Sequence, residues 1–178
     1  MRKHRGAYVI NISSIGGKIY EPLGGWYHAT KFAVEGLSDS LRLELAPHGV
    51  HVVVIEPGAI RTEWGSISAD NLVAASADGP YAEQANTVAA VFRMTDNPRM
   101  GSSPDVVANA VAKAVTARRP RTRYAIGQGA KTILAARKLL TDRGFDRVMT
   151  TGYRLVGRAA NRRARSSVGV GDLAQPSQ

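Results

Sequence analysis

The sequence contains no cysteine among its 178 residues, which excludes disulfides, thiolate metal sites and a cysteine nucleophile. It also lacks any apolar run near the roughly 18 residues that a membrane-spanning helix requires. The N-terminal residues are basic, as in a signal peptide, but the apolar stretch behind them is interrupted at Asn11. The four histidines have no spacing that gathers them on one face: His4, His28, His48 and His51. We therefore expect a cytoplasmic protein without a metal site.

Acidic residues are scarce at the C-terminal end. The formal net charge is +10, from 24 Lys and Arg against 14 Asp and Glu. Residues 118–165 hold 14 of the basic residues but only two of the acidic ones. The pattern indicates a near-neutral body with a basic C-terminal segment, and it does not favour a nucleic-acid binder along the whole chain.

Hydrophobic periodicity predicts alternating strands and helices. Residues 7–12 form a short apolar run, and residues 50–55 form a near-continuous β-branched run of the kind found in strands covered on both faces. Residues 27–45 between them show helical spacing. The expected apolar face of this helix consists of Val34, Leu37, Leu41 and Leu45. The order strand, helix, strand predicts a right-handed βαβ unit in an α/β fold.

The remaining elements are weaker in pattern. Residues 61–98 are small, polar and alanine-rich, with one or two short helices. Residues 104–117 predict a helix capped by Ser103, with Val107, Val111 and Val115 on its apolar face. Residues 123–126 predict a last strand, and residues 130–140 predict an amphipathic helix.

Two side chains with acid–base potential stand one turn apart at the start of the first long helix. Tyr27 and Lys31 share a face because they are four residues apart. A lysine ammonium beside a phenol favours the phenolate, so we expect the pKa of Tyr27 to be lowered. Ser14 follows the first strand, at the carboxyl edge where open α/β sheets place ligands.

Three motifs occur in a fixed order: Asn11-Ile12-Ser13-Ser14-Ile15-Gly16-Gly17, Tyr27-His28-Ala29-Thr30-Lys31 and Glu56-Pro57-Gly58-Ala59-Ile60-Arg61-Thr62. This series resembles the short-chain dehydrogenase/reductase family, most closely over residues 1–65. The segment from Tyr27 to Trp64 is similar to the branch of 17β-hydroxysteroid and retinol dehydrogenases.

The resemblance implies a role for each matching position. Tyr27 would exchange a proton with the substrate oxygen, and Ser14 would hydrogen-bond the same oxygen. Lys31 would hold the nicotinamide ribose. Groups of the turn after the second strand would hold the nicotinamide carboxamide: Pro57, Gly58, Ile60 and Thr62. The implied reaction transfers a hydride between NAD or NADP and an alcohol or ketone, with a homo-oligomer as the family's common assembly.

The same resemblance implies an incomplete Rossmann-like fold. The glycine-rich loop that binds pyrophosphate after the first strand of the family's fold is absent from this sequence. Gly127-Gln128-Gly129 lies near the other end of the chain and lacks the third glycine. The sequence therefore corresponds to strands five to seven of a doubly wound parallel sheet. We divide it into the C-terminal part of a dinucleotide-binding domain (1–127, with a substrate lid at 63–100), a basic helical segment (128–165) and a disordered tail (166–178).

Two other interpretations start from the basic segment. Eight arginines could neutralise the phosphates of a nucleic acid: Arg118, Arg119, Arg121, Arg123, Arg158, Arg162, Arg163 and Arg165. Residues 131–140 have an apolar side and a basic side, as in helices that lie on anionic membranes. An inactive fragment, a nucleic-acid-binding module and a peripheral membrane protein thus stay open beside the enzyme.

Overall fold

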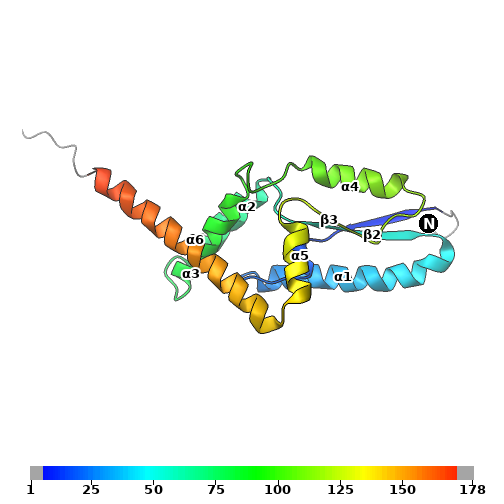
Figure 1. Ribbon diagram of the computed structural model, residues 1–178, viewed down its shortest axis with the longest axis horizontal. Helices are drawn as coiled ribbons and strands as arrows, with labels where there is room; N and C mark the ends of the chain where they lie inside the picture. Colours follow the sequence, from blue (N-terminus) through cyan, green and yellow to red (C-terminus); the bar gives the residue numbers. More distant parts are fainter. Residues whose placement is uncertain (1–5, 172–178) are drawn as a thin grey trace, which may run out of the picture.

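A computed structural model describes the backbone of residues 6–171 and the side chains of residues 6–159. Its centre is a parallel sheet of β1 (Tyr8–Ile12), β2 (His51–Pro57) and β3 (Arg123–Ile126), in the order β1-β2-β3. Helix α1 (Gly25–Leu45) lies on one face of the sheet and α4 (Asp105–Thr116) on the other (Figure 1). The predicted α/β fold with a doubly wound parallel sheet is therefore confirmed.

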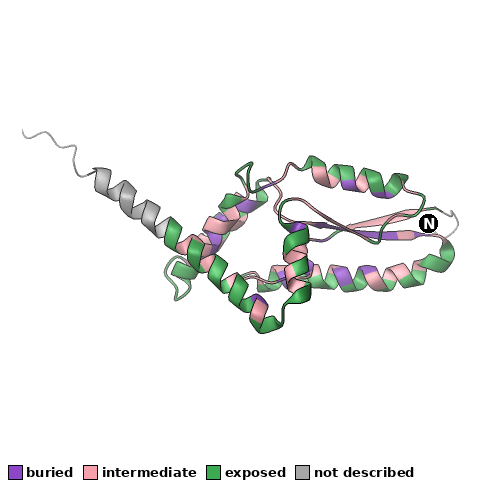
Figure 2. Ribbon diagram, in the orientation of Figure 1, coloured by how far each residue is buried: buried purple, intermediate pink, exposed green. Residues whose placement is uncertain are grey.

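The core lies along β2, whose central residues are all buried (Figure 2). Val53 and Ile55 face α4 and pack against Ala110 and Ala114. A β-branched strand between two helices buries both of its faces, which explains the near-continuous apolar run. In α4, by contrast, Val115 is exposed, so the predicted valine face is wrong at that position. The small alanines allow α4 to approach the sheet closely.

The face that α1 turns to the sheet is mixed. Val34, Leu41 and Leu45 of the predicted apolar stripe are half-buried, but the fully buried positions of the helix are polar. Leu37 is 58% exposed, whereas Glu35 and Ser38 are buried. The sheet offers partners for these polar groups, since the Asn11 amide donates to the Ser38 hydroxyl at 2.8 Å. Buried polar groups are stable only when they are paired in this way.

Two helices fill the segment expected to form the substrate lid. They are α2 (Trp64–Ser76) and α3 (Ala82–Met94), which pack against each other. The segment then returns to α4. Pro104 occupies the N-cap position without a side-chain cap, so the predicted Ser103 cap is wrong, although the Ser103 hydroxyl accepts the Asp105 amide at 3.3 Å.

The C-terminal segment forms α5 (Ala130–Leu139) and α6 (Asp142–Gly171). Helix α5 packs beside β3, and α6 then runs across α3 (Figure 1). Helix α6 continues six residues past the boundary expected at residue 165, and residues 172–178 of the expected disordered tail lie outside the described residues. Over the described residues, none of the helices combines the length and apolarity needed to cross a membrane.

Candidate functional site

The ends of β1 and β2 meet at Ser14. This residue is the second after the end of β1, and its hydroxyl accepts the Gly16 amide at 3.0 Å. The same hydroxyl donates to the carbonyl oxygen of Pro57, the last residue of β2, at 3.5 Å. The serine thus lies at the carboxyl edge of the sheet, where ligands of open α/β folds bind.

The first turns of α1 bring Tyr27 and Lys31 to the same edge. The Ser14 hydroxyl lies close enough to the Tyr27 phenol to influence its ionisation. The Lys31 ammonium donates to the carbonyl oxygen of Ile12 at 3.2 Å and lies 5.9 Å from the centre of the Tyr27 ring. Ser14, Tyr27 and Lys31, named from three separate sequence positions, therefore surround one point on the surface.

The ionisation of Tyr27 differs from the prediction. Burial raises the pKa of Tyr27 above its ordinary value, and the negative charge of Glu21 adds to the rise. The neighbouring Ser14 hydroxyl acts to lower the pKa of Tyr27 but does not reverse the rise. The expected lowering of the Tyr27 pKa by Lys31 is absent, because the ammonium binds the Ile12 carbonyl oxygen instead of the phenol.

The turn after β2 is held between two other segments. A side chain at Gly58 would place its Cβ 2.7 Å from the Gln128 carbonyl oxygen, so only glycine fits. Ile60 pairs with Ser102 in an isolated bridge. Thr62 is exposed, and its hydroxyl accepts the Trp64 amide at 3.4 Å. The turn thus presents backbone and a hydroxyl group beside the end of β2.

An aromatic cluster links Tyr27 to the lid helices. The Trp64 ring of α2 lies 5.5 Å from the Tyr27 ring and 5.4 Å from the Phe92 ring of α3. Tyr81, which directly precedes α3, is mostly exposed. A hydrophobic wall therefore stands beside the phenol.

His28 has a structural role that the sequence did not reveal. It is buried, although a surface position is the common one for a histidine beside an exposed helix start. Its Nδ1 lies 2.8 Å from the Gly16 carbonyl oxygen, and its Nε2 accepts the Glu21 amide at 3.1 Å. His28 thereby fixes the loop between Ser14 and α1. The only sequence signal for this role of His28 is its position next to Tyr27.

Arg123, counted among the arginines of the basic segment, is half-buried and pairs with acidic residues of the fold. Its guanidinium donates to Glu35 at 3.0 Å and to Asp39 at 2.8 Å, and its Nε lies 3.2 Å from Glu56. Lys18 approaches Glu35 at 3.2 Å. These contacts pair Glu35 Oε2 and Asp39 of α1, while Glu35 Oε1 has no hydrogen-bond partner among the described residues. They also remove Arg123 from the set available to phosphates.

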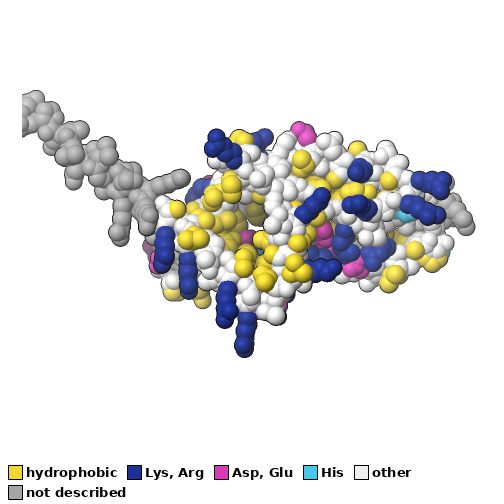
Figure 3. Space-filling model, in the orientation of Figure 1, with side chains coloured by type: hydrophobic (Ala, Val, Ile, Leu, Met, Phe, Trp, Pro, Cys, Tyr) yellow, Lys and Arg dark blue, Asp and Glu magenta, His cyan; other side chains and the backbone are white. Residues whose placement is uncertain are grey.

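The other basic side chains are spread over the surface. Figure 3 shows Lys and Arg separated by apolar and uncharged groups on the face in view. Arg137 of α5 lies over the rings of Tyr20 and Phe145 and pairs with Asp142 at 2.7 Å. The side chains of Arg162, Arg163 and Arg165 lie outside the described residues.

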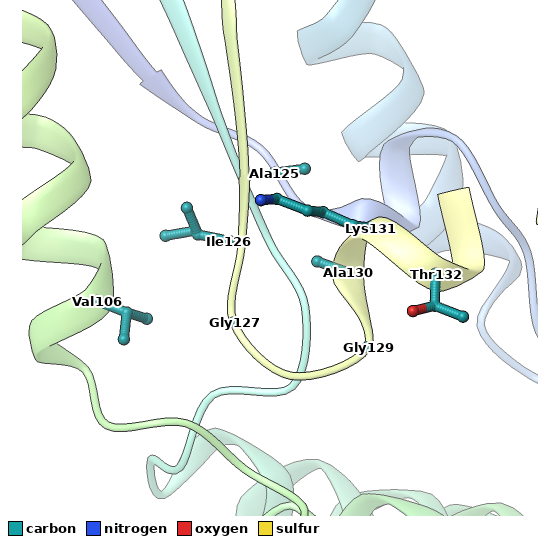
Figure 4. A pocket seen from close by; sticks show the side chains of 8 residues that line it. All are labelled: Val106, Ala125, Ile126, Gly127, Gly129, Ala130, Lys131 and Thr132. Carbon is teal, nitrogen blue, oxygen red and sulfur yellow. The ribbon is translucent and has the colours of Figure 1, made fainter. Parts of the chain in front are cut away.

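A cavity of about 450 Å³ lies at the end of β3, away from the candidate catalytic residues. The turn Gly127–Gly129 and the start of α5 form its wall, and Lys131 reaches across it (Figure 4). Ser14, Tyr27 and Trp64 are absent from its lining. We therefore locate the candidate active site at the exposed edge beside Tyr27.

Comparison with known proteins indicates the family. A family model described as short chain dehydrogenase matches residues 1–71, which include all three motifs. The comparisons thus support the short-chain dehydrogenase/reductase family as the one that this chain resembles. Among curated members of this family, mouse retinol dehydrogenase 5 is 37% identical over 151 residues, covering 80% of this chain and 47% of the relative. The NADPH-dependent 3-dehydrocapnine reductase of Ornithobacterium rhinotracheale is 35% identical over 146 residues, covering 79% and 48%.

Solved structures of the family agree. A short-chain dehydrogenase from Streptomyces avermitilis superposes with a TM-score of 0.58 and 29% identity, covering 90% of this chain and 55% of that one. The chain thus spans about half the length of the short-chain dehydrogenases and reductases that it matches.

Proposed function

We propose that this chain supplies the catalytic side of an oxidoreductase that transfers a hydride between NAD or NADP and an alcohol or carbonyl compound. The observation that carries the proposal is the convergence of Ser14, Tyr27 and Lys31 at the carboxyl edge of the sheet. The resemblance to this family supports the reaction class.

The proton chemistry follows from the state of Tyr27. A phenol whose pKa is raised by burial keeps its proton at neutral pH, so it can donate that proton to a carbonyl oxygen during reduction. Ser14 lies beside the phenol, and its hydroxyl can bind the same oxygen. Oxidation of an alcohol requires the phenolate, so it is favoured as the pH rises toward the raised pKa of Tyr27.

The residues at this edge fit the nicotinamide and ribose side of the cofactor. Lys31 provides an ammonium donor for ribose hydroxyls, and Thr62 provides an exposed hydroxyl. Gly58 has no room for a side chain, so the backbone of the Pro57–Thr62 turn is what would contact the nicotinamide. The bound cofactor supplies or accepts the hydride, which no side chain of a protein can do.

The hydrophobic wall indicates the substrate class. Trp64 and Phe92 stand beside Tyr27, where the carbon skeleton of a substrate would lie when its oxygen meets the phenol. We propose a small-molecule alcohol, ketone or aldehyde with an apolar body, bound between the sheet edge and the lid helices.

The test is reduction of a panel of apolar ketones and aldehydes, followed as loss of dihydronicotinamide absorbance at saturating NADH or NADPH. Tyr27→Phe removes only the proton donor, so turnover should fall by roughly 10²–10⁴-fold. Tyr8→Phe is the matched control, because the Tyr8 hydroxyl donates to the Ala117 carbonyl oxygen at the other end of β1. Equal turnover in wild type and Tyr27→Phe would refute the proposal.

A further inference from the structure

The C-terminal helix α6 reaches the loop that precedes α1. The Tyr153 hydroxyl donates to the Glu21 carboxylate at 2.7 Å, a contact between residues 132 positions apart. Nearer the start of α6, the Asp146 carboxylate accepts the Tyr20 hydroxyl at 2.8 Å. Two tyrosine–carboxylate contacts therefore join the same loop to the same helix. The two contacts differ in the residues that each carboxylate-bearing residue contacts next.

From Glu21, a series of hydrogen bonds leads inward to the candidate site. The Glu21 amide donates to His28 Nε2 at 3.1 Å, and the Glu21 carboxylate lies 3.8 Å from that nitrogen. Since Nε2 accepts, the proton of the neutral ring is on Nδ1, which donates to the Gly16 carbonyl oxygen at 2.8 Å. The Gly16 amide then donates to the Ser14 hydroxyl.

The loop has little room to shift along this path. A Cβ at Gly16 would lie 2.8 Å from the Tyr27 ring, and a Cβ at Gly24 would lie 2.8 Å from His28 Nε2. Close packing of this kind transmits a displacement at one end to the other.

Helix α6 is itself firmly held. Phe145 is fully buried, with its ring centre 5.3 Å from that of Tyr20. Further along, a Cβ at Gly157 would lie 2.9 Å from the Thr87 hydroxyl of the lid helix α3. The end of the chain that carries Tyr153 therefore contacts the lid and the loop together.

We propose that Tyr153 is a positioning residue for the candidate site: its hydroxyl holds Glu21, and the contacts of Glu21, His28 and Gly16 hold Ser14 against Tyr27. The assignment of Ser14 and Tyr27 as the reacting pair rests on the proposed function. The contacts themselves are properties of the chain without substrate.

The test is a double-mutant cycle read at the Tyr27 phenol, titrated by NMR with ¹³C-labelled tyrosine. The charged or titratable groups around this phenol are Glu21, Lys31 and His28. Glu21→Gln removes a negative charge that raises the Tyr27 pKa, so the pKa should fall. In a Tyr153→Phe background the carboxylate is no longer held, and the same substitution should produce less than half of that fall.

Tyr20→Phe is the matched control, because it removes the other tyrosine–carboxylate contact between the same loop and helix. In that background Glu21→Gln should keep its full effect. Equal effects of Glu21→Gln in the wild-type and Tyr153→Phe backgrounds, or none in either, would overturn the proposal. This cycle needs neither cofactor nor substrate, so its outcome is separate from that of the turnover assay.

Amide hydrogen exchange gives a second readout. Tyr153→Phe should speed exchange at the Gly16 and Glu21 amides by roughly fivefold to tenfold, as expected for the loss of one hydrogen bond in a local network. Tyr20→Phe should leave the Gly16 amide unchanged. Acceleration by Tyr20→Phe alone would contradict the proposal, as would unchanged Gly16 exchange in Tyr153→Phe.

Discussion

Glu56, near the end of the buried strand β2, is a residue whose environment sets how stability depends on pH. Burial raises the pKa of Glu56, and the neighbouring charge of Glu35 raises it further, against the opposing effect of Arg123 and Lys18. A carboxyl group with a raised pKa binds its proton more tightly in the folded state than in the unfolded state. Its contribution to stability is therefore complete below about pH 4.5, the ordinary value, and is lost as the pH rises through the raised pKa.

Substitution of Glu56 by glutamine should flatten this pH dependence. We predict that the free energy of unfolding of wild type declines as the pH rises above about 4.5, and that the decline is smaller in Glu56→Gln. Urea denaturation at a series of pH values measures the free energy of unfolding of both proteins. Identical slopes in the two proteins would contradict the prediction.

Asp39 provides a contrast of opposite sign. Burial acts to raise its pKa, but hydrogen bonds from Arg42 and Arg123 hold the pKa below its ordinary value. The contribution of Asp39 to stability is therefore present at neutral pH and is lost as the pH falls through the lowered pKa. Asp39→Asn should accordingly weaken the loss of stability in acid.

Among the elements, α1, β2 and β3 are joined by one guanidinium. Arg123 of β3 contacts Glu35 and Asp39 of α1 and Glu56 of β2, and both glutamates are buried. Removal of one partner from a buried ion pair leaves a charge without compensation, which costs more than the pair itself contributes.

Arg123→Met should therefore destabilise the fold toward the low end of about 3–5 kcal/mol, since the arginine is partly exposed. Glu35→Gln in the same chain should recover part of the loss, because it removes one of the two buried charges. Denaturant unfolding of the single and double variants measures the coupling. A loss that is unchanged by Glu35→Gln would show that the arginine acts through packing alone.

How far the sequence predicts each element depends on the range of the interactions involved. The strand β2 follows from the local hydrophobic pattern. The convergence of Ser14 and Tyr27 follows from the order of the motifs. The buried face of α1 does not, because Glu35 is accommodated by an arginine from a strand 88 residues away. The roles of Glu21 and Tyr153 likewise depend on a distant contact that leaves no periodic signal.

For the molecule as a whole, the outer strands β1 and β3 each have an edge with no strand paired to it within the described residues. Strand β1 pairs with β2 on one side, and no described strand pairs with it on the other. Ile12 at the end of this strand is 46% exposed. Unpaired strand edges with apolar side chains favour association with another chain.

We predict that the 178-residue chain is marginally stable and associates in a concentration-dependent way through the open edge of β1. Ile12→Lys places a charge at the edge and should reduce the association, as edge lysines do in natural sheets. Sedimentation velocity at several concentrations compares the two proteins. A wild-type chain that stays monomeric at high concentration would contradict the prediction.

The most direct test of the central claim, that this chain holds the nicotinamide side of a short-chain dehydrogenase/reductase site, is binding of reduced nicotinamide mononucleotide to the labelled chain by NMR. This half-cofactor does not need a pyrophosphate loop for the adenine half. We predict weak binding with shifts at Ser14, Lys31 and Thr62, lost in Lys31→Met. Shifts confined to Gly127 and Lys131 at the cavity beyond β3, or no shifts at all, would contradict the account.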